Sequence, residues 1–222
     1  MELAESNMKQ TVRLRDMAEI NQYRQELRNK IIDYAMAEFY KRGVKAVKMD
    51  EISRGLHVSK RTVYEIFGDK EELLLAGMKM QQAKEMQSLE EFANTQARNV
   101  IDIISYVYKL QMRRNEQVGV VFYEEIHKIP RVVEFMREYH SKECEERSKF
   151  FAAGVKEGLF RPDLNYEVLS EVGHVTMEEI MHRQLYRTYS MQELYDNYVL
   201  TVIRGFCTER GLMALDRALA GL

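Results

Sequence analysis

The chain has 222 residues, a formal net charge of −2, two prolines and two cysteines, Cys144 and Cys207, that form no Cys-x-x-Cys pattern. Because the two cysteines are far apart in the sequence, we expect neither a disulfide framework nor a zinc site. Apolar stretches such as 73–78 are far shorter than the roughly 18 residues that a membrane span requires. The first ten residues lack the apolar core of a signal peptide. We therefore expect a protein of the reducing cytoplasm with no membrane, metal or cofactor partner.

Residues 1–23 precede the first clear amphipathic pattern. Residues 1–26 hold four basic and five acidic side chains, so they do not form a basic arm suited to a minor groove. We expect this extension to be a frayed or additional helix that uses Leu14 and Met17.

The first amphipathic helix begins near Leu27, because apolar residues recur there at every fourth position and Gly43 then ends the pattern. A second, two-turn helix follows over 49–56, acidic in its first turn. Ser59 is a suitable N-cap for a third helix. In that helix the spacing of Val63 and Phe67 buries one face. Four side chains are then left pointing outward: Lys60, Arg61, Tyr64 and Glu65.

Two short helices joined by a tight turn, after a supporting helix, are typical of a helix-turn-helix module whose third helix enters the DNA major groove. The charge distribution favours this interpretation. Between Lys41 and Arg61 there are seven basic and two acidic side chains, a local charge of +5 in a chain that totals −2. Such a local basic patch favours binding to a polyanion.

Helices continue to the end of the chain, which predicts an all-α protein with no strand. Asp69 with Glu72 resembles a capping box and begins a helix that runs to about Ala93. Apolar periodicity predicts further helices over 100–110, 117–128 and 130–158, with Pro130 between the last two.

The last third predicts two helices that are apolar on more than one side. Asn165 can cap a helix that ends near Arg187, and Ser190 with Glu193 forms a capping box for a helix that ends near Glu209. A second apolar stripe suggests a partner helix from another copy, although both stripes could instead be buried within one chain.

Residues Lys45 to Leu74, "KAVKMDEISRGLHVSKRTVYEIFGDKEELL", resemble the DNA-binding segment of TetR-family transcriptional regulators. The positions that match the family pattern are Ile52, Val58, Ser59, Thr62, Tyr64, Phe67, Lys70, Glu71 and Leu73. Three positions depart from it: His57 replaces the turn glycine, Lys48 replaces the Ser or Thr that caps the second helix, and Gly68 replaces a frequent proline.

The resemblance implies a helix-turn-helix domain over 24–70 and a larger helical effector-binding and dimerisation domain over 71–222. It implies that Tyr64 and Lys70 contact DNA phosphates, with help from Ser59. Lys60, Arg61 and Thr62 are the expected base readers, and Lys48 adds a charge that attracts phosphate. For Lys60 and Arg61 the alternative is an ordinary solvated face, and for Tyr64 it is packing against the first helix.

The resemblance also implies a pocket and a dimer interface in the larger domain. Aromatic and methionine side chains are the pocket candidates, although each is also a plausible core residue: Tyr106, Met112, Phe122, Tyr123, Phe151 and Met177. The expected interface uses residues on the late helices: Val172, Met191, Tyr195, Tyr198, Val202 and Phe206.

His174, Glu178 and His182 share one helix face, but three ligands along two turns rarely converge on one ion, so we expect a solvent or dimer face there. Common catalytic signatures are absent from the sequence. We therefore expect a homodimeric, ligand-responsive DNA-binding repressor that an effector releases from a palindromic operator. The alternatives are a helical enzyme, a small-molecule carrier or a protein-binding adaptor.

Overall fold

The structure, a computed structural model, describes residues 2–142 and 144–220, with side chains at 21–139 and 145–220. The described part is helical and contains no strand, as the sequence predicts, apart from an isolated antiparallel bridge between Phe160 and Cys207. Among these residues, no helix is both long and apolar enough to cross a membrane.

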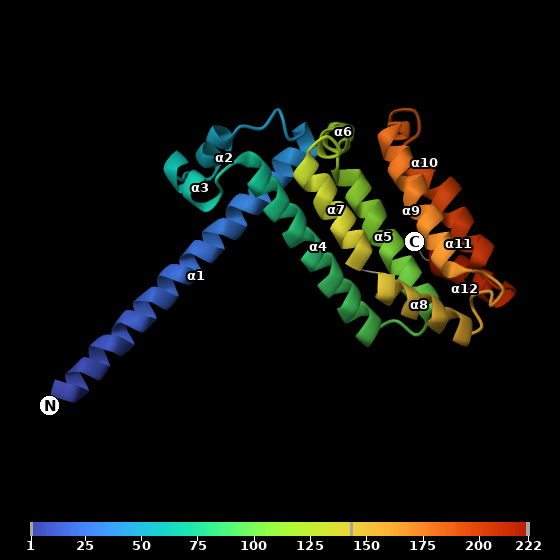
Figure 1. The fold of residues 1–222 in the computed structure, drawn as a ribbon, viewed down its shortest axis with the longest axis horizontal. Coiled ribbons are helices and arrows are strands. Elements are labelled where there is room, and N and C mark those ends of the chain that lie inside the picture. Colours follow the sequence, from blue (N-terminus) through green and yellow to red (C-terminus); the bar gives the residue numbers. More distant parts are fainter. Residues whose placement is uncertain (1, 143, 221–222) are drawn as a thin grey trace.

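Figure 1 shows a long first helix that projects from a helical body, with two short helices beside it and the remaining helices packed side by side. The helices of the first part are α1 (Glu2–Arg42), α2 (Met49–Gly55), α3 (Lys60–Ile66) and α4 (Lys70–Thr95). The second part contains α5 (Val100–Gln117), α6 (Val120–Ile126), α7 (Pro130–Lys142), α8 (Cys144–Lys156), α9 (Tyr166–His182), η1 (Leu185–Arg187), α10 (Met191–Leu194), η2 (Tyr195–Val199), α11 (Leu200–Phe206) and α12 (Glu209–Ala220).

The helix-turn-helix module has its own apolar core. The predicted stripe of α1 is buried around Ile31 and Phe39, and it meets Ile52 of α2 and Val63 of α3. Buried side chains contribute roughly 1.5 to 3 kcal/mol each, so this core holds α2 and α3, two helices of seven residues that could not be stable alone, against α1. Gly43 ends the stripe with φ +83°, as predicted, and its N–H donates to Phe39 O at 2.8 Å.

The extension before this module is helical. The backbone of 2–23 continues without a break into the supporting helix, so α1 is one helix of 41 residues. Figure 1 shows this part of α1 leaving the body as a single rod. Leu14 and Met17 lie outside the residues whose side chains the structure describes.

Two helix ends predicted for the last third were wrong. α9 ends at His182 rather than near Arg187, because Gln184 adopts φ +57° and starts a separate 3-10 turn. The final predicted helix ends at Phe206 rather than near Glu209, because Cys207 is extended and pairs with Phe160. A further helix, α12, then packs against α5 with Leu215 fully buried.

Candidate DNA-binding site

The turn between α2 and α3 accepts a histidine where the sequence pattern favours glycine. His57 has φ +55°, a left-handed conformation that costs a non-glycine residue free energy. The turn is closed by backbone hydrogen bonds, in which Val58 N–H donates to Ser53 O at 3.0 Å and His57 N–H donates to Arg54 O at 3.2 Å. The strained position is therefore held by the surrounding structure.

Ser59 caps α3, as predicted from its place before the helix. Its Oγ accepts from the Thr62 N–H at 3.0 Å and lies 2.7 Å from Thr62 Oγ1. Val63 and Phe67 are buried beneath the helix, so the opposite face is directed to solvent. The Ser59 cap and the buried face of α3 together determine which side chains of the helix point to solvent.

The outward face of α3 carries two cations that are held by carboxylates. Lys60 Nζ lies 2.9 Å from Asp50 Oδ1, and Arg61 Nε lies 2.7 Å from Glu65 Oε1. Hydrogen bonding to these carboxylates raises the pKa of Lys60 and of Arg61. The side chain of Arg61 is 88% exposed, and exposed pairs stabilise a protein by only about 0 to 1 kcal/mol. Both cations can therefore exchange these partners for phosphates or bases at small cost.

Tyr64 lies on the same face and is 42% exposed, with the Lys60 Nζ located 5.8 Å from its ring centroid. Lys48 precedes α2 as its N-cap, makes no capping hydrogen bond through its side chain and is exposed. The predicted contacts at Lys48, Ser59 and Tyr64 thus lie on or next to α2 and α3, two helices that contact each other, together with Lys60 and Arg61.

Lys70 occupies a different place from the one expected of a phosphate contact. Its ammonium donates to the carbonyl oxygens of Val44 at 2.7 Å, Val47 at 2.9 Å and Lys45 at 3.3 Å. Burial lowers the pKa of Lys70. All three donors of this ammonium face the loop between α1 and α2, so we remove Lys70 from the proposed DNA contacts and assign it to holding that loop.

Sequence reasoning missed two arginines beside α3. A shallow hollow between α1 and α3 is lined by Asn21, Arg24, Gln25, Arg28, Glu65 and Ile66. The guanidinium carbon of Arg28 lies 5.4 Å from the ring centroid of Phe67. Arg24 and Arg28 are four residues apart and so lie on one face of α1. This spacing is visible in the sequence and could have identified the pair.

The six predicted pocket residues do not surround one cavity. Phe122 and Tyr123 are buried in the core that α6 shares with the helix-turn-helix module. Tyr106 stacks on Phe92 at 4.2 Å, between α4 and α5. Phe151 packs against a different core cluster, where its ring contacts Tyr166 and Phe206. Met112 and Met177 are half-buried.

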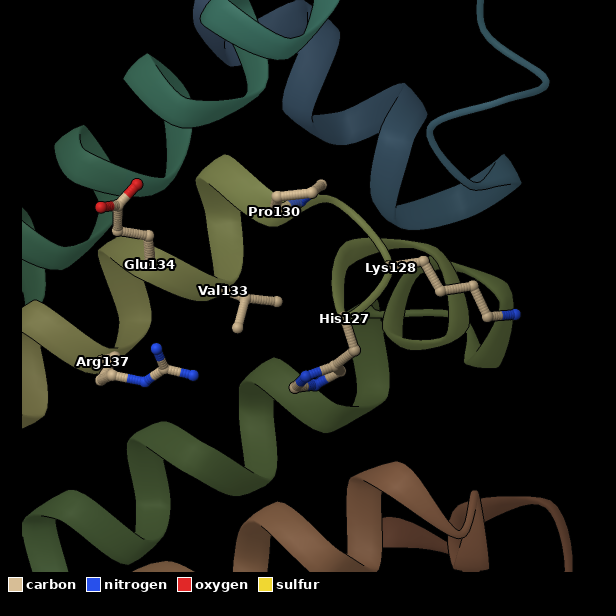
Figure 2. Close-up of a pocket in the computed structure, with 6 residues that line it drawn as sticks. All are labelled: His127, Lys128, Pro130, Val133, Glu134 and Arg137. Atoms are coloured by element: carbon tan, nitrogen blue, oxygen red, sulfur yellow. The ribbon is translucent and has the colours of Figure 1, made fainter.

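A hollow that the sequence did not predict lies where α6 meets α7. It is lined by His127, Lys128, Pro130, Val133, Glu134 and Arg137. Figure 2 shows the His127 ring and the Arg137 guanidinium approaching the hollow from two sides, whereas Lys128 points away. Burial lowers the pKa of His127, and the negative charge of Glu178 opposes that shift.

The late helices expose an apolar stripe, although not all of the predicted residues belong to it. Val168, Val172 and Val175 of α9 are each more than half exposed. Four other candidates are half-buried: Met191, Tyr195, Tyr198 and Val202. Phe206 is buried against Phe160 at 5.0 Å and against Phe151 at 5.7 Å, so it belongs to the core rather than to an exposed face.

The histidines of α9 contact different carboxylates. His174 Nε2 lies 3.4 Å from Glu178 Oε1, whereas His182 Nδ1 lies 3.9 Å from Glu179 Oε2. No group of three or more metal-ligating side chains occurs among the residues whose side chains are placed.

α6 contacts the helix-turn-helix module directly. The Gly119 N–H, at the start of α6, donates to Tyr40 O at 2.8 Å, and the Tyr40 ring packs edge-on against Phe122 at 4.9 Å. The Lys45 N–H donates to Glu125 Oε2 at 2.7 Å. A displacement of α6 would therefore act directly on the end of α1 and on the loop before α2.

Residues 31–76 match the family profile described as "Bacterial regulatory proteins, tetR family". A transcriptional regulator from Saccharomonospora viridis in complex with choline is 17% identical with a TM-score of 0.64, over 83% of this chain and 100% of that one. The TetR family protein CprB from S. coelicolor A3(2) is 16% identical with a TM-score of 0.61, over 89% and 97%. A gamma-butyrolactone receptor is 16% identical with a TM-score of 0.58, over 90% and 100%. These structures share the fold with this chain, and no curated protein matches its sequence.

Proposed function

We propose that this chain, a member of the TetR family of DNA-binding transcription regulators, is a homodimeric repressor that a small-molecule effector releases from a palindromic operator. The proposal makes it a cytoplasmic regulator rather than an enzyme. The observation that carries the proposal is the exposed face of α3. There two cations and Tyr64 stand on a helix whose opposite face is fixed in the core.

In this proposal α3 enters the major groove. The five donors of a guanidinium fork suit guanine O6 and N7, so Arg61 is the first candidate for reading a base, with Lys60 and Thr62 beside it. Tyr64, Lys48 and the Ser59 end of the helix would contact phosphates and set the register. Arg24 and Arg28 of α1, which line a hollow together with Glu65 and Ile66 of α3, would add two cations to this interface.

The dimer is supported by the valine stripe of α9. Three exposed valines at spacings of four and three residues form one apolar helix face, the kind of surface that marks a protein interface. Gly173, on the same helix, and Gly205 of α11 have open space where a side chain would be. Helices from a second copy could approach closely at both glycines. The proposed interface thus contains Val172, Tyr198 and Val202 but not Phe206.

Release by an effector is supported by the contacts of α6. A ligand that moves α6 would pull on Lys45 through Glu125 and on Tyr40 through Gly119, and so change the distance between the two α3 helices of the dimer. A palindrome requires these helices to lie about 34 Å apart, one turn of DNA. A ligand that favours a different distance would release the DNA.

Selection from a random duplex library tests the proposal. The purified protein should enrich a palindrome whose half-sites are centred about one helical turn, or a multiple of it, apart. Val172→Glu should fail to enrich it, because a monomer contacts only one half-site. Enrichment of a single asymmetric site by a monomeric wild type would contradict the homodimer, and no enrichment at all would contradict DNA recognition by α3.

A further inference from the structure

A polar cluster lies inside the larger part of the protein, at the end of α5 nearest the helix-turn-helix module. It consists of Arg114 and Asn115 of α5, Tyr123 of α6, Tyr40 of α1 and Tyr195 at the start of η2, and we call it the Arg114 cluster. Tyr40, Tyr123 and Tyr195 each lie close enough to Arg114 for its charge to lower their pKa against the larger effect of burial. Four elements distant in sequence therefore converge on one guanidinium.

Two hydrogen-bond donors of the cluster have no acceptor. Arg114 Nε and Asn115 Nδ2 are buried without a hydrogen-bond partner among the residues whose side chains the structure describes. The oxygen end of the Asn115 amide is occupied, since Oδ1 accepts from Gln111 Nε2 at 3.1 Å and from the Tyr123 hydroxyl at 3.3 Å. A buried donor without an acceptor costs about 1 to 3 kcal/mol, so two on adjacent residues call for a functional reason.

The charge of Arg114 is only loosely compensated. Its Nη1 lies 3.6 Å from Glu85 Oε2, beyond hydrogen-bond distance, while Glu85 Oε1 accepts from Gln81 Nε2 at 3.0 Å. One third of each of the two side chains, Arg114 and Glu85, is exposed. Arg114 and Glu85 therefore lie between the buried cluster and solvent, so a solute can reach the Arg114 guanidinium.

The tyrosines add further donors. Burial raises the pKa of Tyr40 and raises that of Tyr195 to about 12, so both phenols stay protonated at neutral pH. Tyr195 also begins a π-helical turn, Tyr195–Val199, a geometry often found at functional sites. The cluster thus has an excess of donors and three aromatic rings around them.

We propose that the Arg114 cluster binds the carboxylate of a small organic acid and that such an acid is the effector. This inference rests on the proposed function, which it deepens by naming the chemical class of the ligand. The two carboxylate oxygens would accept from Arg114, Asn115 and the Tyr195 hydroxyl, and the tyrosine rings would pack against the organic part. Tyr40 lies on α1, so the bound acid would touch the supporting helix of the DNA-binding module directly.

The test uses benzoate and octanoate as probes, with benzamide and octanamide as uncharged counterparts. Binding to the full chain is measured by calorimetry up to about 10 mM, and the Arg114 Nε–Hε signal is followed by NMR. We expect a carboxylate to bind and to shift that signal. Arg114→Gln should weaken binding at least about tenfold, whereas Arg113→Gln, the exposed neighbour on the same helix, should leave it unchanged.

Tyr195→Phe removes a hydroxyl with little change of shape, so it serves as a second variant if Arg114→Gln fails to fold. We expect Tyr195→Phe to bind the carboxylate severalfold more weakly than wild type. The inference is overturned if neither carboxylate binds, if the amides bind equally well, or if Arg114→Gln and Tyr195→Phe both bind like wild type. Operator binding is measured separately on the same samples. Specific DNA binding without carboxylate binding would remove this inference alone, whereas carboxylate binding without DNA binding would remove the proposed function.

Discussion

The backbone N–H of Lys45 donates to the carboxylate of Glu125 across 2.7 Å, and this bond ties the loop before α2 to α6. Two parts of the chain separated by 80 residues meet there. Hydrogen bonds to a charged group stabilise a protein by about 1.5 to 3 kcal/mol when well shielded and by less when exposed. This bond is exposed, so its contribution falls below that range.

Glu125→Ala should therefore lower the free energy of unfolding by about 1 kcal/mol, measured by urea denaturation. It should also weaken the response of operator binding to an effector, because α6 loses its hold on the loop. Glu116→Ala, an exposed glutamate on α5, is the matched control. If Glu125→Ala and Glu116→Ala lowered the free energy of unfolding and the effector response equally, the contact with Lys45 would have no specific role.

Lys70→Met should destabilise the helix-turn-helix module, because three loop carbonyl oxygens lose their donor while the apolar stem is kept. We expect a loss of about 2 to 3 kcal/mol in urea denaturation, as for hydrogen bonds made by a charged donor. At a temperature where the variant is folded, its DNA affinity should stay within about twofold to threefold of wild type. A phosphate contact would give the reverse pattern, with stability retained and DNA affinity lost.

His127 should make the protein less stable in mild acid. Burial lowers its pKa in the folded state, so the unfolded chain binds the proton more readily. The stability contributed by neutral His127 is present above its unfolded pKa, about 6.5, and is lost as the pH falls through the lower folded value. The maximum slope for one proton is about 1.4 kcal/mol per pH unit.

His127→Asn should flatten this dependence in urea denaturation measured between about pH 7 and pH 5. The charged groups around the hollow, Lys128, Glu134 and Arg137, remain in the variant, as does Glu178 of α9. His182→Asn is the control, since that histidine is exposed. If only the control flattened the curve, the assignment to His127 would be wrong.

Val172→Glu should convert the protein to a monomer. A monomer has a mass of 26.3 kDa, and light scattering should give twice that value for the wild type and the single value for the variant. Burying a carboxylate in an apolar interface without a partner costs several kcal/mol, enough to separate the copies. Met86→Glu places the same charge on an exposed position of α4 and should remain dimeric. A dimeric Val172→Glu would move the interface away from α9.

Local signals in the sequence predicted much of the fold. Ser59, Asn165 and Ser190 cap the helices that they precede, and Gly43 ends its helix in a left-handed conformation. These features depend on neighbours within a few residues, so they can be read from a short stretch. The end of α9 has no comparable signal in the sequence, because it depends on a positive φ at Gln184 and glutamine rarely adopts positive φ.

Features that depend on tertiary contacts could not be predicted in this way. Lys70 turns back to a loop more than twenty residues earlier, and Phe206 is buried because a bridge between Phe160 and Cys207 brings two segments together. The Arg114 cluster draws on four elements with no shared periodicity. Helical spacing identifies a face of one helix, but it does not say which distant face will meet it.

The central claim is that α3 reads DNA, and the most direct test is the salt dependence of binding to a selected operator. Binding is measured by fluorescence anisotropy for wild type, for Arg61→Ala and for the control Arg217→Ala, which changes an exposed arginine of α12. Wild type and Arg217→Ala should lose on the order of 10³ in affinity between about 50 and about 200 mM salt if about six phosphates are contacted. Arg61→Ala should cost about tenfold or more on the operator and much less on random duplex. Operator binding by Arg61→Ala that equals wild type, or wild-type binding that is insensitive to salt, would contradict the claim.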